Sequence, residues 1–462
     1  MMTTLRRCFL LTISALAFAP NSTPAADTVT GPKEPKILWV LKSTEHFVAA
    51  PSVGEKDVFV ATVGAFNTGA VHAVQLDPAK GYKERIRWTR SAPQLKLPTV
   101  SCPAVADGKI IFGDGMHQND GGTLHCLSAE SGGPLWQLPL PGTLIHLEGS
   151  PAIANGRVYM GGGNSGVFCV ELDRVILNGK EQDAKLVAAE IEKQRKELFV
   201  KYEEEKKIDP DFAVPPSEDK LPKATPKIAW HVGQEKWHVD AAVAVAGDKV
   251  FAASAYLDKE RQGERALLCL NATDGSVKWK SPLKHNPWSG PVVGGKTVLV
   301  GESSVRLDPE QLQGAKGEIV AIDVDNGTVR WHKDIPGGIV SAGVANERVA
   351  IFTATDGKVR CIKLSDGNDA WAVDVGAPLF AGAALSSDTV YVGDLKGRVH
   401  AISLSEGKKL WTLDLLADPA KIGGMIYGTP TIRNGRLYVA TCSVVESGGE
   451  RRPNAVVCIG EK

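Results

Sequence analysis

Eight of the ten tryptophans recur at nearly regular intervals, and this repeat limits the fold more than any other feature of the chain. Successive intervals are 40–52 residues, apart from one of 94 residues between Trp136 and Trp230. Short β-branched and aromatic runs recur at the same spacing. Most of them follow a two-residue turn such as Asn-Gly or Asp-Gly, which is typical of β-hairpins. The repeated tryptophans are Trp39, Trp88, Trp136, Trp230, Trp279, Trp331, Trp371 and Trp411.

Each repeat holds four apolar runs, which we interpret as four strands named A to D in chain order. Eight such units predict an all-β eight-bladed β-propeller over residues 27–462. The last repeat ends one strand short, whereas residues 37–39 form a strand with no partner before it. We therefore expect this N-terminal strand to complete the last blade, which removes an exposed sheet edge.

The first 26 residues have the pattern of a secretory signal peptide. Arg6 and Arg7 precede an apolar stretch at residues 8–19, and small residues follow at Ala25 and Ala26. This stretch is too short for a permanent transmembrane helix. The pattern predicts a periplasmic or secreted protein. Export through the general secretory route and through the twin-arginine route are both open, because the leader also resembles a twin-arginine signal.

The long interval after Trp136 predicts an insertion at residues 174–226, between strands C and D of the third blade. Residues 180–207 are charged and favour a helix, with an apolar stripe at Val187, Ile191, Leu198 and Tyr202. A stretch rich in Pro and charge follows. We keep two interpretations open, namely a solvated helix on the propeller rim and a docking arm for a partner.

Charge and cysteine usage exclude several classes of protein. Lys plus Arg equals Asp plus Glu at 53 each, so nucleic acid is not an expected partner. No later stretch is apolar enough to span a membrane. Cys126, Cys169, Cys269, Cys361 and Cys458 occupy one strand-C position in separate blades. Such positions are too far apart for a disulfide, so we predict no disulfide. We also expect the protein to be a monomer.

The innermost strands carry polar residues in one register, which gives the only sharp indication of a site. His146 and Glu148 in one blade match His238 and Asp240 in the next, and residues i and i+2 share a strand face. Two imidazoles and two carboxylates are suitable ligands for Zn²⁺, so these four residues form a candidate metal site. The alternatives are solvated side chains at a channel mouth and a ligand pocket. The candidate pocket adds His46, Trp237, Trp288 and Tyr427.

Residues 321–331, Ala-Ile-Asp-Val-Asp-Asn-Gly-Thr-Val-Arg-Trp, resemble the tryptophan-docking motif of PQQ-type, or quinoprotein-like, propeller repeats. The family pattern is Ala-x-Asp-x-x-Thr-Gly-x-x-x-Trp, and Asn326 replaces its Thr. Weaker copies end at Trp136, Trp279, Trp371 and Trp411. The resemblance covers nearly the whole mature chain and implies the propeller fold. Because the motif is a packing device, it does not by itself imply an activity.

The resemblance leaves the function open between three hypotheses. The first is a non-catalytic exported scaffold, as in BamB-like propellers, which binds envelope proteins or a small ligand at the funnel and needs no cofactor. The second is a PQQ-dependent oxidoreductase. The dehydrogenases of the family carry adjacent bonded cysteines and a set of calcium ligands, whereas this chain has no Cys-Cys pair. The third is carbohydrate or polymer binding at the funnel mouth.

Overall fold

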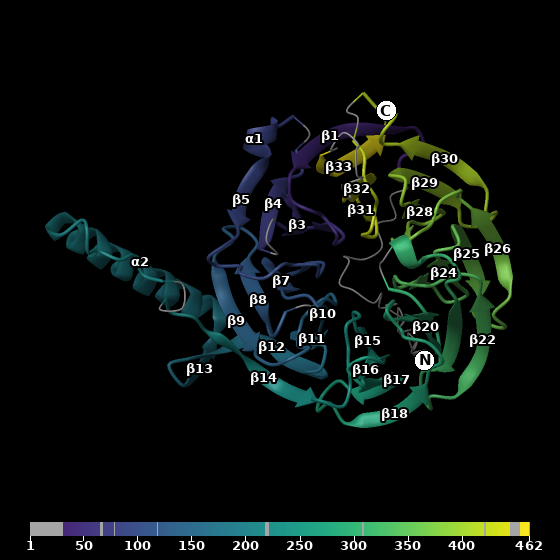
Figure 1. Ribbon diagram of the computed structural model, residues 1–462, viewed down its shortest axis with the longest axis horizontal. Helices are drawn as coiled ribbons and strands as arrows, with labels where there is room; N and C mark the ends of the chain where they lie inside the picture. The colour runs from purple at the N-terminus through teal and green to yellow at the C-terminus, as the bar shows by residue number, and fades with distance from the viewer. Residues whose placement is uncertain are drawn as a thin grey trace, which may run out of the picture.

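Eight β-sheets are arranged in a ring around a central axis, as the predicted propeller requires (Figure 1). The computed structural model describes residues 31–461 except 65–67, 78, 118, 218–220, 307–308, 420–421 and 444–452. The predicted signal peptide, residues 1–26, lies outside the described residues. No helix in the part of the chain that the structure describes is long and apolar enough to cross a membrane.

The first four blades follow one another along the chain, each an antiparallel sheet. Blade 1 comprises β2 (Ser52–Val53), β3 (Asp57–Val63), β4 (Gly69–Gln75) and β5 (Ile86–Arg90), with the short helix α1 (Tyr82–Arg85) before β5. Blade 2 comprises β6 (Ala104–Ala106), β7 (Lys109–Gly113), β8 (Gly122–Ser128) and β9 (Pro134–Leu140). Blade 3 comprises β10 (Ala152–Ala154), β11 (Arg157–Gly161), β12 (Val167–Leu177), β13 (Lys180–Asp183) and β14 (Thr225–Val232). Blade 4 comprises β15 (Ala244–Ala246), β16 (Lys249–Leu257), β17 (Gln262–Asn271) and β18 (Val277–Pro282).

The other four blades repeat the pattern. Blade 5 comprises β19 (Pro291–Gly294), β20 (Thr297–Ser303), β21 (Gly317–Asp323) and β22 (Val329–Ile335), with the 3₁₀ turn η3 (Pro309–Gln311). Blade 6 comprises β23 (Val344–Ala345), β24 (Val349–Thr353), β25 (Lys358–Lys363) and β26 (Asp369–Asp374). Blade 7 comprises β27 (Ala384–Leu385), β28 (Thr389–Gly393), β29 (Arg398–Ser403) and β30 (Lys409–Asp414). Blade 8 comprises β31 (Thr431–Arg433), β32 (Arg436–Thr441), β33 (Asn454–Glu461) and the N-terminal β1 (Pro35–Ser43).

The ring is closed by strands from the two ends of the chain, and the prediction of N-terminal closure is confirmed. Strand β1 pairs antiparallel with β33 from Pro35 opposite Glu461 to Ser43 opposite Asn454. The outer edge of β33 is therefore paired with the first strand along its length, with one irregularity between Ile37 and Trp39. The indole nitrogen of Trp411 in blade 7 also donates to the carbonyl of Pro32, 2.8 Å away. The start of the chain thus contacts two blades.

The repeated tryptophans occupy one position in all eight blades. Each lies on the outermost strand, opposite the strand-C cysteine or alanine; for example, Trp331 is opposite Ala321 and Trp371 is opposite Cys361. In seven blades the indole nitrogen donates to a backbone carbonyl of the next blade or, for Trp411, of the N-terminal segment. The tryptophans therefore connect neighbouring blades.

The hydrophobic core is divided among the interfaces between blades. One cluster, for example, joins Leu299 and Ile319 of blade 5 to Phe352 of blade 6. The strand-C cysteines are buried in these interfaces, as small apolar side chains are. All seven cysteines of the described chain are free: Cys102, Cys126, Cys169, Cys269, Cys361, Cys442 and Cys458.

Blade 3 differs from the predicted four-strand unit because its third strand extends beyond the sheet. Residues Arg174–Leu177 of β12 pair with the additional strand β13, and the chain then enters helix α2 (Ala184–Ile208). Asp183 caps this helix by accepting the backbone N–H of Lys185 at 2.8 Å. Ala184, Val187 and Ile191 are buried at the helix base, whereas most of the later side chains are exposed. The helix therefore projects from the rim as an arm (Figure 1).

Candidate functional site

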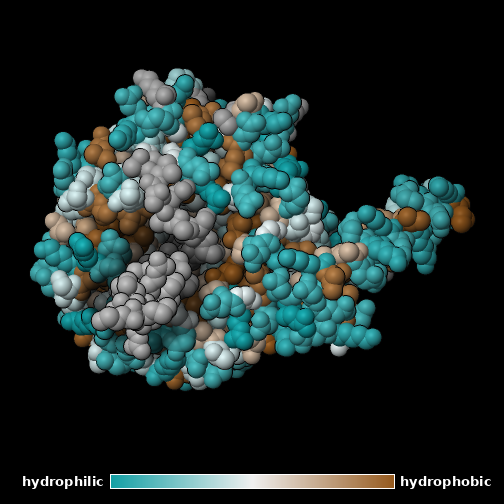
Figure 2. Space-filling view, turned by 180° about the vertical axis from the view of Figure 1, so that it is seen from behind, coloured by the Kyte–Doolittle hydropathy of each residue, from teal (hydrophilic) through white to brown (hydrophobic). Residues whose placement is uncertain are grey.

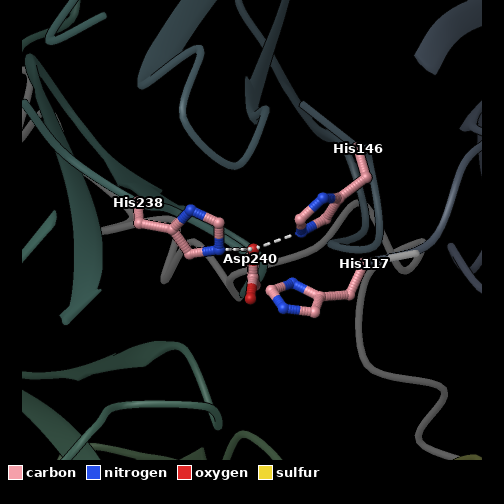
Figure 3. A group of neighbouring side chains, drawn as sticks. All are labelled: His117, His146, His238 and Asp240. Atoms are coloured by element: carbon pink, nitrogen blue, oxygen red, sulfur yellow. Dashed lines mark hydrogen bonds and ion pairs between the residues drawn. The ribbon is translucent and has the colours of Figure 1, made fainter. Parts of the chain in front are cut away.

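Three histidines and one aspartate from three blades meet on one face of the propeller (Figure 3). His117 lies in the loop between β7 and β8, and His146 lies between β9 and β10. His238 and Asp240 lie between β14 and β15. In an antiparallel four-stranded blade, the loop from strand B to strand C and the connection into strand A are at the same end of the sheet. The loops of neighbouring blades therefore converge there.

The carboxylate of Asp240 lies between the imidazoles of His146 and His238. Its Oδ1 atom is 2.8 Å from Nε2 of His146 and 2.9 Å from Nε2 of His238 (Figure 3). One ligand atom from each of these three residues and one from His117 all lie within 4.8 Å of one another. His146 and His238 are fully buried, and Asp240 is 8% exposed. We call His117, His146, His238 and Asp240 the histidine cluster.

The orientation of His238 is set by Asn164, in the turn between β11 and β12. Oδ1 of Asn164 accepts a hydrogen bond from Nδ1 of His238 at 2.7 Å. A neutral ring that carries its proton on Nδ1 has a lone pair on Nε2. Nε2 makes no hydrogen bond, although it lies close to Asp240. Nε2 of His238 therefore faces the centre of the histidine cluster.

Glu148 and Arg306 surround the cluster. Oε1 of Glu148 accepts the backbone N–H of His117 at 2.7 Å and lies 3.9 Å from Nε2 of His146. Arg306, in the loop after β20, donates to Oδ2 of Asp240 at 2.8 Å. The Arg306 guanidinium also lies over the ring of Trp288, 4.3 Å from its centroid. Arg306 therefore neutralises one oxygen of Asp240 and leaves the other oxygen to the histidines.

Burial and charge shift the pKa values of the cluster in opposite directions. Burial raises the pKa of Glu148, and the charge of Asp240 adds to this effect. Burial also opposes the charged forms of Asp240 and His146. For Asp240 the attraction of His238 and His146 outweighs burial, and for His146 the attraction of Asp240 does so. The pKa of Asp240 is therefore well below its usual value, and the pKa of His146 is raised. Burial lowers the pKa of His117, and the charge of Arg306 lowers it further.

The structure brings together His146, His238 and Asp240 of the candidate metal site and places Glu148 beside them. The other four residues of the candidate pocket, His46, Trp237, Trp288 and Tyr427, do not all border this cluster. Trp288 borders the cluster through Arg306. Trp237 packs in the blade core next to Gly233 and donates to Glu264 at 2.7 Å.

The last two residues of the candidate pocket contact other blades. His46 pairs with Val63 of blade 1, and its Nδ1 lies 3.4 Å from Sγ of Cys442 in blade 8. Tyr427 packs its ring against Phe380, with the centroids 5.4 Å apart. Trp237, Trp288 and Tyr427 therefore each pack against a different partner.

Sequence reasoning missed His117, Asn164 and Arg306, and all three lie in loops between strands B and C. The sequence contains one signal that could have identified them. The loops that follow strand B in blades 2, 3 and 5 carry a His, an Asn and an Arg, and these loops open on the same face as the predicted pairs. The predicted pairs come from a comparison of the residues that precede strand A in each blade, and that comparison does not include the loops between strands B and C.

The fold and the repeated tryptophan contacts define a PQQ-type β-propeller. The chain belongs to the family described as Outer membrane protein assembly factor BamB, whose model matches residues 25–188, 220–340 and 288–446. No curated protein matches the chain in sequence.

Solved structures resemble the chain in fold at low sequence identity. BamB from Moraxella catarrhalis is 13% identical with a TM-score of 0.57, and the match covers 92% of this chain and 97% of that one. Quinohemoprotein alcohol dehydrogenase from Comamonas testosteroni is 13% identical with a TM-score of 0.55, covering 93% and 77%. A europium-containing methanol dehydrogenase is 12% identical with a TM-score of 0.53, covering 92% and 93%. These similarities show the shared propeller fold.

Proposed function

We propose that the protein is a non-catalytic exported propeller that acts as a monomeric protein-interaction scaffold in the periplasm or outside the cell. In this proposal residues 1–26 are a signal peptide that is removed on export. Membership of the BamB family supports a role in the cell envelope. The observation that carries the proposal is the α2 arm, because it carries exposed apolar side chains.

The arm has the composition of a binding surface. Phe199, Val200 and Ile208 on α2 are 44%, 58% and 86% exposed, and Phe212 and Val214 after it are 82% and 76% exposed. Figure 2 shows hydrophobic surface along the projecting arm and at its tip, within a mainly hydrophilic surface. Burying apolar side chains such as these contributes about 1.5–3 kcal/mol each, so a partner with a complementary apolar surface is favoured.

A groove lies where the arm leaves the propeller, and it extends this surface. Its volume is about 790 Å³, and its walls come from α2 and from blades 1 and 2. Phe199 and Val200 line one side, and Leu95, Leu127 and Pro134 line the other. Charged side chains also line the groove, among them Arg195 and Glu203. A groove lined by apolar and charged side chains is suited to a segment of another envelope protein.

The donor set of the central face does not fit the calcium and quinone chemistry of the family's dehydrogenases. Ca²⁺ takes six to eight oxygen ligands, whereas the histidine cluster offers three imidazoles and one carboxylate. The cysteines of the described chain are free, and no two are adjacent in the sequence. One face of the Trp288 ring, which could otherwise stack on a planar cofactor, is covered by the Arg306 guanidinium. These observations favour the scaffold over the oxidoreductase.

The experiment is a pull-down from the envelope fraction with the mature protein and with a Phe199→Gln/Val200→Gln/Ile208→Gln variant. The substitutions leave the buried helix base intact, so the fold is expected to persist. The matched control is Val277→Gln/Val329→Gln/Leu410→Gln, which changes three apolar side chains of similar exposure on outer strands. We expect partners to be lost only with the arm variant. Equal capture by both variants would contradict the arm as the binding surface.

A separate measurement tests the oxidoreductase alternative. The mature protein is incubated with PQQ and Ca²⁺, separated from free quinone, and assayed for quinone absorbance and for dye reduction with alcohols. We expect neither retained quinone nor turnover. Stoichiometric quinone with turnover would overturn the non-catalytic proposal.

A further inference from the structure

We propose that His117, His146, His238 and Asp240 bind one borderline divalent transition-metal ion, with Zn²⁺ as the best match. The ion would be held by Nε2 of His146, Nε2 of His238, Oδ1 of Asp240 and one ring nitrogen of His117. This inference does not rest on the scaffold proposal, because it concerns a different surface and a different ligand. It goes beyond the sequence prediction by replacing Glu148 with His117 as the fourth ligand.

The donor atoms are already close to the spacing that a tetrahedral ion needs. Zn–N and Zn–O bonds of about 2.0–2.2 Å place tetrahedral ligands roughly 3.3–3.6 Å apart. All four residues offer a donor atom within 4.8 Å of the others. Oδ1 of Asp240 is 2.8 Å from Nε2 of His146 and 2.9 Å from Nε2 of His238. Binding an ion would require each Nε2 atom to move away from Oδ1 of Asp240 by about 0.4–0.8 Å.

The second observation is a group of buried nitrogen atoms without a hydrogen-bond partner among the described residues. They are Nδ1 of His117, Nδ1 of His146 and Nε2 of His238, the last of which still lies 2.9 Å from Oδ1 of Asp240. A buried polar atom without a partner is energetically unfavourable. For His238 the unpaired atom is the proposed ligand itself. The hydrogen bond from Nδ1 to Asn164 is the arrangement that fixes metal-binding histidines in other proteins.

The charge around the cluster also favours a cation. Asp240 and Glu148 are two carboxylates, and Arg306 is the cation that contacts both, 2.8 Å and 3.6 Å away. Two carboxyl groups therefore face one guanidinium in a largely buried site. A divalent ion beside Oδ1 of Asp240 would compensate the charge of this carboxylate, while Arg306 keeps Oδ2. The carboxylate would then bridge the ion and the guanidinium.

The chemistry of the donors selects the class of metal. Imidazole is a good ligand for Zn²⁺, Cu²⁺, Ni²⁺ and Co²⁺, whereas Ca²⁺ and Mg²⁺ prefer oxygen. Four protein ligands leave no open position, which is typical of structural rather than catalytic zinc. The ligands come from blades 2, 3 and 4, since His238 and Asp240 precede the first strand of blade 4. The ion would therefore join three neighbouring blades at their inner loops.

The test uses the mature protein after dialysis against a chelator. Isothermal titration with Zn²⁺ is expected to give one ion per chain, and titration with Co²⁺ is expected to give the intense visible bands of a tetrahedral N₃O site. His117→Ala is expected to weaken binding of both ions by at least about 10-fold, because it removes a ligand from a half-exposed loop with little risk to folding. Asn164→Ala is expected to weaken binding by about 10–100-fold, with partial recovery in Asn164→Asp.

The matched control is His332→Ala. His332 also pairs with a carboxylate, Glu318 at 2.8 Å, but it is not part of the cluster. Its variant is expected to bind the metal like the wild type. Substoichiometric metal in the wild type would overturn the proposal. So would the weak bands of six-coordinate Co²⁺, or a loss below about 10-fold in His117→Ala.

Discussion

Gly367 of blade 6 lies against the indole ring of Trp331 of blade 5, so closely that a Cβ atom on Gly367 would be 2.7 Å from the ring. The indole nitrogen of Trp331 donates to the carbonyl of Leu364, 2.9 Å away in the same blade as Gly367. The Gly and Trp of one motif copy therefore act in different interfaces. The same contact recurs at four other pairs: Gly132 on Trp88, Gly275 on Trp230, Gly327 on Trp279 and Gly407 on Trp371.

A side chain at Gly367 should weaken the interface between blades 5 and 6. Gly367 has φ +76°, and the Trp331 ring fills the space of a Cβ atom. We expect Gly367→Ala to lower the free energy of unfolding by about 1–3 kcal/mol through overpacking, in addition to backbone strain. Gly179→Ala is the control, because Gly179 has φ +74° and nothing lies within 4 Å of its Cβ position. Urea unfolding should show a clearly larger loss for Gly367→Ala, and equal losses would contradict the role of the contact.

Removal of the N-terminal strand should open the ring. A chain that begins after Val40 lacks most of β1, which leaves β33 with an unpaired edge. We expect this chain to aggregate or to lose cooperative thermal unfolding, as measured by circular dichroism and light scattering. A chain that begins at Gly31 retains all of β1 and serves as the control. Equal stability of the two chains would contradict closure by β1.

Asp394 holds together the turn between β28 and β29 in blade 7. It is fully buried, accepts the backbone N–H groups of Lys396 and Arg398 at 2.9 Å, and pairs with His400 at 3.0 Å. We expect Asp394→Ala to lower the free energy of unfolding by about 3–5 kcal/mol, because it leaves the Arg398 guanidinium, 2.7 Å from Asp394, and the buried donors without their acceptor.

The control for Asp394 is Asp374→Ala. Asp374 is exposed, and its side chain accepts the backbone N–H of Gly376. We expect this change to cost about 1 kcal/mol or less in urea unfolding. Similar costs at the two positions would show that burial of the Asp394 network is not important.

Glu302 should make the stability depend on pH. The side chain is fully buried in β20, and burial, with a further contribution from Glu318, raises the pKa of Glu302 to about 7. Between about pH 4.5 and pH 7 the folded chain retains a proton that the unfolded chain releases. The free energy of unfolding therefore falls as pH rises through this window, by roughly 3 kcal/mol in total.

The comparison for Glu302 is a series of urea unfolding curves from pH 5 to pH 8. Glu302→Gln removes the titrating group, so its stability relative to the wild type should improve as pH rises. Glu347→Gln changes an exposed glutamate in the same manner and should leave the pH dependence unaltered. Parallel pH profiles for the wild type and Glu302→Gln would contradict the raised pKa.

Much of the architecture was predictable because each blade repeats one local pattern. The spacing of the tryptophans gave the number of blades, and the unpaired strand around Trp39 gave the closure. Both follow from strand periodicity and turn residues, which act over short stretches of chain. The additional strand β13 was not predicted, because residues 180–183 are charged and read as the start of the helix.

The candidate site was only partly predictable from the sequence. The sequence by itself determined that His146 and His238 occupy one register in adjacent blades, because equal positions in a repeat have equal positions in space. Only the tertiary structure decided that His117, Asn164 and Arg306 join them, because these residues lie in loops whose conformation is set by packing between blades. It also decided that Trp237 turns into the core, where burial of its ring outweighs exposure at the funnel.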